Sequence, residues 1–195
     1  MIARLDRSRM SVEDYLRLDH ESTGERYEYI DGYAYMLAGG TADHAKICAN
    51  MIRELSVALQ NSACSVYTSD LKMRLSEKRY VYPDISVSCD ARDGGTRDFL
   101  QFPRLVVEVL SQSTAAYDRS QKFDYYRACP TIEEYVLVET QRRAVDVYRR
   151  AKKDLWTLHF FRSSDLIELT SLNVSFPMSA VYQNVLLPSD EDIDE

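Results

Sequence analysis

The sequence predicts a single α/β (α+β) domain, with a mixed central β-sheet flanked by helices. Short β-branched and aliphatic segments alternate along the chain with two longer segments of helical periodicity. No internal repeat and no linker rich in Pro, Gly or Ser divides the 195 residues, a length typical of one domain. We therefore predict one domain over residues 1–188, followed by a flexible acidic tail at 189–195.

The charge of the chain excludes a protein that coats nucleic acid through bulk electrostatics. The net charge is −7, whereas non-specific affinity for phosphates comes from Lys and Arg. The tail holds five carboxylates, and removing them from the total leaves −2 for the rest of the chain. Any nucleic-acid site must therefore be a local basic patch or a metal centre.

Targeting signals and cysteines indicate the compartment. The sequence has no secretory signal and no apolar run of the roughly 18 residues that span a bilayer, so we expect a soluble, cytoplasmic protein without a membrane partner. The cysteines show no CxxC pair and no histidine at zinc-ligand spacing. In a reducing compartment we expect four unpaired, buried or half-buried thiols, at Cys48, Cys64, Cys89 and Cys129.

The first half of the chain predicts two helices and four strands. Ser11 begins a capping box, the sequence Asp31-Gly32 is a strong hairpin turn, and Ile47, Met51 and Leu55 recur at helical spacing. The expected elements are a short helix after residues 11–14, a hairpin at 26–38, a helix at 42–60, strands near 65–75 and 81–88, and a charged loop at 90–102.

The second half predicts one long helix among strands. Residues 104–110 are almost continuously aliphatic, which is typical of a strand covered on both faces. The following helix, at 115–128, must stop before Cys129-Pro130, because the residue before a proline avoids helical backbone. Further strands are expected at 133–140, 143–149, 155–161 and 166–172, with a short last helix at 179–186.

Glu108 interrupts the aliphatic run at 104–110. A carboxylate in a covered strand costs several kcal/mol unless it is paired or bound to a cation. The alternatives are an edge position or a buried ion pair with an arginine. Glu108 is therefore the first candidate for chemistry.

Asp84 is expected where a strand begins. Pro83 before it lacks an N–H and belongs at a strand start or an edge, and Ile85 and Val87 then face the opposite side. A Pro-Asp pair alone is a common turn, but adjacent strands could bring Asp84 close to Glu108, 24 residues later. Two such carboxylates would share a hard cation, whose preferred ligands are oxygens, or one of them would take up a proton.

Asp118 and Lys122 lie four residues apart on the helix that follows the Glu108 strand. Alone, this spacing would indicate an exposed helical ion pair worth about 0.3–0.5 kcal/mol. With the two acids, Lys122 would instead point back over the strand end. There it could orient or deprotonate a water, or stabilise a phosphorane-like transition state.

Together and in this order, these residues resemble a family of small, single-domain nucleases, frequent in bacterial genomes, within the PD-(D/E)XK (restriction-endonuclease-like) superfamily. The resemblance covers residues 11–187. Its recognisable pieces are Arg26-Tyr-Glu-Tyr-Ile-Asp-Gly32, His44, Tyr82-Pro-Asp84, Leu105-Val-Val-Glu-Val-Leu-Ser111, Asp118 with Lys122, and Glu134-Tyr-Val-Leu-Val138. The resemblance implies a restriction-endonuclease-like core.

The resemblance also implies a role for each matched residue. Asp84 matches the aspartate of the Pro-Asp element and Glu108 the acid of the (D/E)XK element. Both would bind Mg²⁺ or Mn²⁺, with the Val109 carbonyl as a further metal ligand. Leu110 stands where the superfamily normally has its lysine, and in this family the lysine lies on the following helix, where Lys122 occurs.

Two more residues are predicted in or beside the catalytic site. Glu28 matches an acid in the family's first strand, and its alternative is a cross-strand partner for a basic residue. His44 would contact a ligand or support a metal ligand, and its alternative is a surface or capping histidine with Asp43 as the helix cap. Asp118 is expected to orient Lys122 rather than to bind the metal.

The predicted function is a Mg²⁺- or Mn²⁺-dependent endonuclease that acts on DNA, as a homodimer. Candidate phosphate contacts are Lys72, Arg74, Lys78, Arg79, Arg92, Arg97 and Arg104. Two other classes stay open. One is an inactive nuclease-fold module that binds nucleic acid or a protein partner. The other is a metal-independent hydrolase with paired carboxylates, such as a glycosidase. The response of the protein to metal distinguishes these classes.

Overall fold

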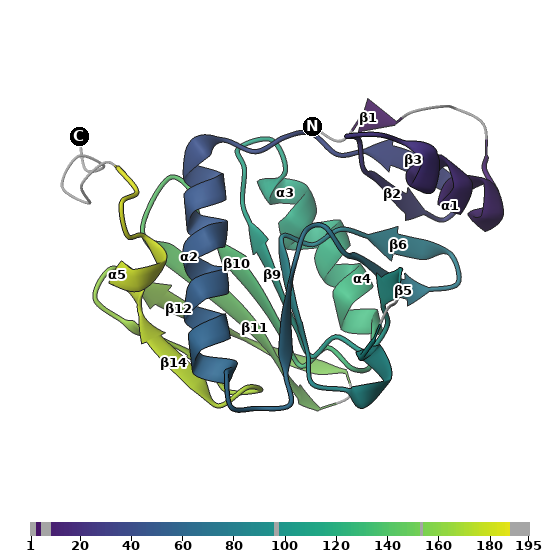
Figure 1. The fold of residues 1–195 in the computed structure, drawn as a ribbon. Helices are drawn as coiled ribbons and strands as arrows, with labels where there is room; N and C mark the ends of the chain where they lie inside the picture. The colour runs from purple at the N-terminus through teal and green to yellow at the C-terminus, as the bar shows by residue number, and fades with distance from the viewer. Residues whose placement is uncertain (1–2, 5–8, 96–97, 153, 188–195) are drawn as a thin grey trace.

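The computed structural model describes residues 3–4, 9–95, 98–152 and 154–187, which form a mixed α+β architecture (Figure 1). This is the predicted fold class. Its central sheet contains, in spatial order, β12 (Leu155–Arg162), β11 (Ala144–Lys152), β10 (Glu134–Val138), β9 (Leu105–Val109), β7 (Ile85–Ser88) and β4 (Ser65–Thr68). Arg97 and the predicted tail at 189–195 lie outside the described residues.

A second sheet lies beside the central one. Its order is β1 (Ala3–Arg4), β3 (Tyr33–Met36), β2 (Tyr27–Ile30), β6 (Arg79–Val81), β5 (Lys72–Ser76) and β8 (Phe99–Leu100). The predicted hairpin at 26–38 supplies β2 and β3, and the turn between them places Asp31 and Gly32 at positive φ. Helix α1 (Val12–Glu21), capped by the Ser11 side chain, packs on this sheet through the fully buried Tyr15.

The central sheet is mixed, as predicted. Strands β9 and β10 are parallel, whereas the other neighbouring strands of this sheet are antiparallel. A parallel pair needs a crossover connection. Here the crossover is helical and consists of α3 (Ala115–Tyr117), a π-helix (Asp118–Lys122) and α4 (Phe123–Ala128). The crossover therefore carries Lys122 across the sheet directly after the strand that carries Glu108.

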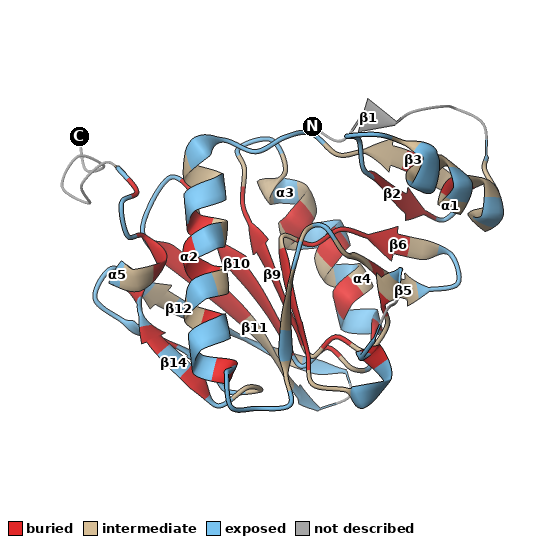
Figure 2. Cartoon of the chain, viewed as in Figure 1, coloured by how far each residue is buried: buried red, intermediate tan, exposed pale blue. Residues whose placement is uncertain are grey.

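Helix α2 (Ala42–Leu59) covers one face of the central sheet. Its buried residues Ile47, Met51 and Leu55 pack in one core with Val107 of β9 and Ile85 of β7. Figure 2 shows the outer side of α2 exposed and the strands behind it buried. Ile85 and Val87 lie on this face, as predicted from the position of Pro83.

The opposite face of the central sheet is covered by the crossover and the second sheet. A second core joins Val106 and Leu110 with Tyr126 of α4 and with Met73 of β5. Since side chains alternate along a strand, Glu108 shares the face of Val106 and Leu110. The carboxylate is thus directed toward the layer that holds Lys122.

Two predicted strands are each divided between the two sheets. The segment 65–75 becomes β4 in the central sheet and β5 in the second, and the segment 81–88 extends from β6 to β7 in the reverse direction. Residues 82–84 separate β6 from β7 because Pro83 has no N–H to continue a ladder. The chain therefore crosses between the sheets at Asp84.

Smaller differences between the predicted and observed elements occur near turns. The predicted strand at 166–172 ends early as β13 (Leu166–Leu169) and pairs with an unexpected strand, β14 (Val174–Pro177), after Asn173 turns at a positive φ. The predicted helix at 179–186 is only α5 (Met178–Val181). The loop at 90–102 contains a 3-10 helix, Ala91–Asp93, and the short strand β8.

The prediction of four unpaired thiols is wrong. Cys64 and Cys89 form a disulfide, and Cys48 and Cys129 are the free cysteines. The reason is the register of the central sheet, in which Ser65 pairs with Ser88. Cys64 and Cys89 are the next residues outward on these antiparallel strands, so they meet although 25 positions separate them. No helix among the described residues is long and apolar enough to cross a membrane.

Candidate active site

Lys122 lies at the centre of a buried acidic cluster. Its Nζ donates to Glu108 Oε1 at 2.9 Å and lies 3.6 Å from both Glu28 Oε1 and Asp118 Oδ1. All four side chains are buried. The spacing of Asp118 and Lys122 therefore produces no exposed surface pair. Residues from β2, β9 and the crossover instead meet around one ammonium group.

The crossover presents three polar side chains to this cluster at intervals of four residues, Asp118, Lys122 and Tyr126. Tyr126 is fully buried and donates to Glu108 Oε1 at 2.5 Å, so the tyrosine and the lysine hold the same oxygen. The π-helix lies within this segment, and such turns are frequent at functional sites. Glu108 is therefore neither at a sheet edge nor paired with an arginine, the two alternatives considered from the sequence. Its ionic partner is Lys122.

Glu28 enters the cluster from the second sheet. Its Oε1 accepts the N–H of Tyr82 at 3.1 Å, in the segment where the chain passes between sheets. Among the described side chains, Glu28 Oε2 is a buried oxygen without a hydrogen-bond partner. Burial of a carboxylate oxygen without a hydrogen bond is energetically unfavourable. Glu28 is therefore a member of the cluster, and its basic neighbour, Lys122, lies on the crossover and not on an adjacent strand.

Asp84 lies at the start of β7, one residue beyond the Ile85–Val107 pair with β9. Its Oδ2 accepts the backbone N–H of Val109 at 2.8 Å and lies 3.2 Å from His44 Nε2. This hydrogen bond attaches Asp84 to the strand that carries Glu108. The Asp84 charge contributes to raising the pKa of Glu108.

His44 is positioned by the first turn of α2. The helix is capped by Thr41, whose hydroxyl accepts the His44 N–H, so Asp43 is not the cap. The imidazole points inward, with Nε2 toward Asp84 and Nδ1 3.6 Å from Cys48 Sγ. Its hydrogen bond with Asp84 raises the pKa of His44, and backbone contact with Val109 contributes in the same direction.

Electrostatics explain why the cluster needs more positive charge. Burial raises the pKa of Glu108 to about 8, against the lowering effect of Lys122. Burial also raises the pKa values of Glu28 and Asp118. Burial alone would lower the pKa of Lys122, but Glu108 and the other acidic neighbours outweigh it and raise that pKa well above its usual value. One ammonium group therefore faces more carboxylates than it neutralises.

The oxygen donors of this cluster fit a hard divalent cation. Asp84 and Glu108 supply carboxylate oxygens from neighbouring strands, and such oxygens are the preferred ligands of Mg²⁺. The excess of buried carboxylates, the unpaired oxygen of Glu28 and the raised pKa of Glu108 are each relieved by an added positive charge.

Among the described candidates for phosphate contacts, most basic side chains already have a protein partner. Four of them make ion pairs with nearby acids: Lys72 with Asp19, Arg79 with Asp31, Arg92 with Asp90, and Arg104 with Glu133. Arg74 lies against the rings of Tyr80 and Phe99.

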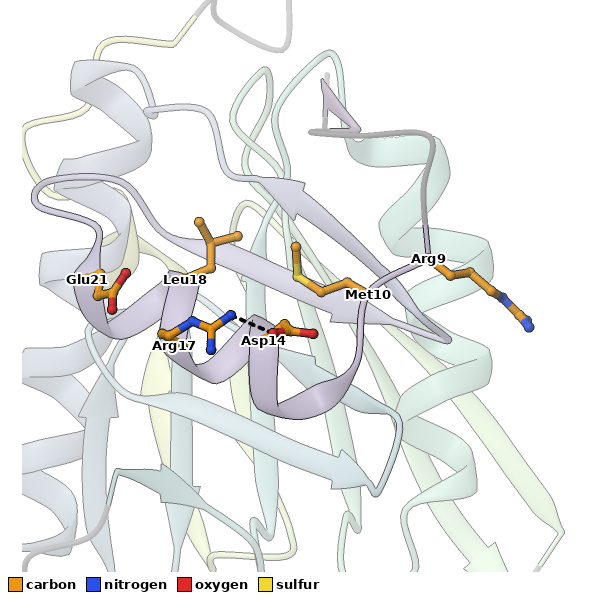
Figure 3. Close-up of a pocket in the computed structure, with 6 residues that line it drawn as sticks. All are labelled: Arg9, Met10, Asp14, Arg17, Leu18 and Glu21. Atoms are coloured by element: carbon orange, nitrogen blue, oxygen red, sulfur yellow. Dashed lines mark hydrogen bonds and ion pairs between the residues drawn. The ribbon is translucent and has the colours of Figure 1, made fainter.

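Figure 3 shows a surface hollow at helix α1. It is open, and none of its lining residues belongs to the predicted site. They come from the approach to α1 and from its outer side: Arg9, Met10, Asp14, Arg17, Leu18 and Glu21. Two of these residues, Asp14 and Arg17, form an ion pair with each other. The concentration of buried charge, and not this hollow, indicates the functional site.

Sequence reasoning missed Tyr126 and Cys48. Both could have been found by helical spacing, because Tyr126 lies four residues after Lys122, and Cys48 lies four after His44. The statement that no cysteine has a histidine at ligand spacing was therefore wrong. His44, Cys48 and Asp84 bring one ligand atom each within 4.8 Å of one another.

One family model and two curated proteins match most of this chain. Residues 12–179 match the Uma2 family model, described as "Putative restriction endonuclease". Two uncharacterized proteins of Synechocystis sp. are similar: slr1290, at 35% identity over 91% of this chain and 93% of that protein, and sll1609, at 29% identity over 76% and 85%.

A solved structure shares the fold. It is a chain from Anabaena variabilis described as "a putative nuclease belonging to DUF820", with a TM-score of 0.74 and 17% identity, covering 91% of this chain and 99% of that one. At that identity the likeness concerns the fold. The match to the family model extends over most of the sequence, from α1 to α5. The chain therefore belongs to the Uma2 family of restriction-endonuclease-like proteins.

Proposed function

We propose that this protein is a divalent-metal-dependent endonuclease that hydrolyses phosphodiester bonds in DNA. The observation that carries the proposal is the cluster of three carboxylates around Lys122. Asp84 is hydrogen-bonded to the backbone of the strand that carries Glu108. A hard cation would neutralise the excess charge of this cluster. Membership of a family described as "Putative restriction endonuclease" supports phosphodiester hydrolysis as the reaction.

Asp84 and Glu108, with the carbonyl of Val109, would hold Mg²⁺ or Mn²⁺. When bound, such an ion supplies charge stabilisation at the scissile phosphate and lowers the pKa of an attacking water. The hydrogen bonds from Lys122 and Tyr126 converge on Oε1 of Glu108, which fixes the orientation of the carboxylate. The products would carry a 3′-hydroxyl and a 5′-phosphate, as is usual in the superfamily.

Lys122 would act as a fixed positive charge. Its pKa is raised by the surrounding acids, so the amine keeps its proton at neutral pH and is unsuited to deprotonate a water. A buried ammonium group held in place is suited to stabilise negative charge that develops on the phosphate. Of the roles considered for this residue, electrostatic stabilisation is therefore the one that we propose.

A metal-independent hydrolase is the second candidate, and one observation favours it. The pKa of Glu108 is raised to about 8, which would let this residue serve as a general acid at neutral pH. A cation bound to the same carboxylate would offset that shift. The response to metal therefore distinguishes the two functions.

Plasmid cleavage with a metal titration tests the proposal. The parent should nick and linearise plasmid DNA with Mg²⁺ or Mn²⁺ and not with EDTA, and either ion should raise its melting temperature. Asp84→Asn and Glu108→Gln should each abolish cleavage while the fold stays intact. Asp70→Asn and Glu133→Gln, both at exposed carboxylates, are matched controls that should cleave like the parent.

Other results of this experiment would favour a different function. Metal-induced stabilisation without cleavage of duplex, single-stranded or branched DNA or RNA would favour an inactive binding module. No response to metal, or equal cleavage by the parent and both site variants, would overturn the proposal. We also propose a homodimer, which would present two sites to the two strands of a duplex, and gel filtration with light scattering tests it.

A further inference from the structure

We propose that His44, Cys48 and Asp84 form a second metal site, selective for a thiophilic divalent ion such as Zn²⁺. This site goes beyond the proposed nuclease centre, since two of its three ligands are not oxygen donors. It shares Asp84 with the proposed Mg²⁺ ligands, and it uses His44, which the sequence predicts in or beside the catalytic site.

The geometry is provided by α2 and the start of β7. His44 and Cys48 lie one turn apart on the same side of the helix, and their Nδ1 and Sγ atoms are 3.6 Å apart. Asp84 reaches the same imidazole from the opposite side, at 3.2 Å from Nε2. One ligand atom from each residue lies within 4.8 Å of the others. All three residues are partly buried, so solvent still reaches the group.

The separation of His44 Nδ1 and Cys48 Sγ matches that of two ligands of a tetrahedral zinc ion. Zn–S bonds of about 2.3 Å and Zn–N bonds of about 2.0–2.1 Å place the two ligand atoms roughly 3.5 Å apart at a tetrahedral angle. The observed distance between Nδ1 and Sγ is close to that value. Movement of the Asp84 carboxylate toward Nδ1 then completes a site with three protein ligands. The fourth position stays open to a water, as in zinc sites that are not purely structural.

The donor set decides which ion binds. A thiolate and an imidazole select Zn²⁺ over Mg²⁺, which prefers oxygen ligands and keeps much of its water shell. Coordination replaces the Cys48 thiol proton, which passes to solvent. Asp84 belongs to both sites, so an ion held by His44 and Cys48 acts directly on a carboxylate that the oxygen-ligand site beside Glu108 also uses.

The other cysteines of the chain do not compete for this ion. Cys64 and Cys89 are joined in a disulfide. Cys129 is buried beyond the end of α4, where its sulfur lies beside the Thr131 hydroxyl. Cys48 is therefore the free thiol placed beside a histidine, and Cys129 provides a matched control.

Cobalt substitution tests the site without measuring catalysis. Co²⁺ bound by a thiolate gives a ligand-to-metal charge-transfer band in the near ultraviolet, and Zn²⁺ should displace the ion and remove that band. The parent and Cys129→Ser should show the band, and Cys48→Ser and His44→Gln should lose it. Glu108→Gln should keep the band while losing stabilisation by Mg²⁺, which separates this site from the nuclease centre.

Substitution of the glycines before α2 gives a second measurement that leaves all ligands in place. A Cβ on Gly40 would lie 2.8 Å from His44 Nδ1, whereas one on Gly39 would meet nothing within 4 Å. Gly40→Ala should therefore weaken Co²⁺ binding and Gly39→Ala should not. Absence of the band in the parent, its persistence in Cys48→Ser, or its loss in Glu108→Gln would overturn the proposal.

Discussion

Lys122 Nζ lies 2.9 Å from Glu108 Oε1, and the two side chains are only 7% and 5% exposed. Breaking a buried pair by removing one partner leaves an uncompensated charge, and this costs more than the pair itself contributes. Here the ammonium group also faces Glu28 and Asp118 at 3.6 Å, so it compensates several carboxylates at once.

Removal of this ammonium group should be strongly destabilising. Lys122→Met keeps most of the side-chain volume but leaves the three carboxylates without their common partner. We expect a loss of about 3–5 kcal/mol in the free energy of unfolding, measured by urea titration at pH 7. Lys46→Met removes an exposed pair with Asp43 and should cost no more than about 1 kcal/mol. Equal effects of the two substitutions would contradict the charge balance described here.

Divalent-metal affinity should increase with pH up to about pH 8. Burial raises the pKa of Glu108 to about 8, so below that pH a cation must displace a proton from this carboxylate. We expect Mn²⁺ affinity to rise roughly tenfold per pH unit for this one proton between pH 6 and 8, then to level off. Isothermal titration calorimetry at several pH values measures this slope. Constant affinity over that range would contradict the raised pKa.

The raised pKa of Glu108 should also make the stability of the metal-free protein depend on pH. Between the usual pKa of an unfolded glutamate and about 8, the folded chain binds the Glu108 proton more tightly than the unfolded chain does. The contribution of Glu108 to the free energy of unfolding therefore falls as pH rises through this window. Glu108→Gln should reduce this pH dependence, and urea titrations of both proteins at pH 5 and pH 8 measure the difference.

The position of the His44 ring should depend on Gly40. An alanine there would force the imidazole to shift from the position in which Nε2 contacts Asp84, because the new Cβ would lie 2.8 Å from Nδ1. The hydrogen bond with Asp84 raises the pKa of His44, so Gly40→Ala should lower that pKa toward its usual value. Proton NMR titration of the three histidines follows this change, with Gly39→Ala as the unaffected control.

This substitution should also change stability in a pH-dependent manner. Since the pKa of His44 is raised in the folded state, its contribution is present at low pH and is lost as pH rises through the folded pKa. Gly40→Ala should therefore cost more stability at pH 6 than at pH 9, by about 0.5–1.5 kcal/mol for one hydrogen bond. An equal cost at both pH values would indicate a backbone effect instead.

The denatured, unreduced protein should expose two thiols, and the reduced protein four. Cys64 and Cys89 are disulfide-bonded, whereas Cys48 and Cys129 are free. In the chain-entropy account, opening a loop with 25 residues of separation costs roughly 3.5 kcal/mol of stability. Thiol titration in denaturant counts the groups, and a Cys64→Ser, Cys89→Ser double variant should titrate as two with or without reductant. Four thiols before reduction would show that the pair is not joined.

Local sequence determined most of the secondary structure and the individual site residues. The Ser11 cap, the Asp31-Gly32 turn and the spacing of Ile47, Met51 and Leu55 gave the correct elements because capping, turn formation and helical periodicity act over a few residues. Glu108 could be singled out because an acid in an aliphatic strand is costly wherever that strand lies. The sequence thus identified which side chains needed a partner.

Tertiary structure alone decided which partners they received. The crossing from β6 to β7 at Pro83, the meeting of Cys64 with Cys89, and the access of Glu28 to Lys122 all depend on how two sheets pack. These contacts join positions that are distant along the chain, and local propensity carries no information about such distances. Their formation depends on strand register and on burial of apolar faces, which are properties of the whole fold.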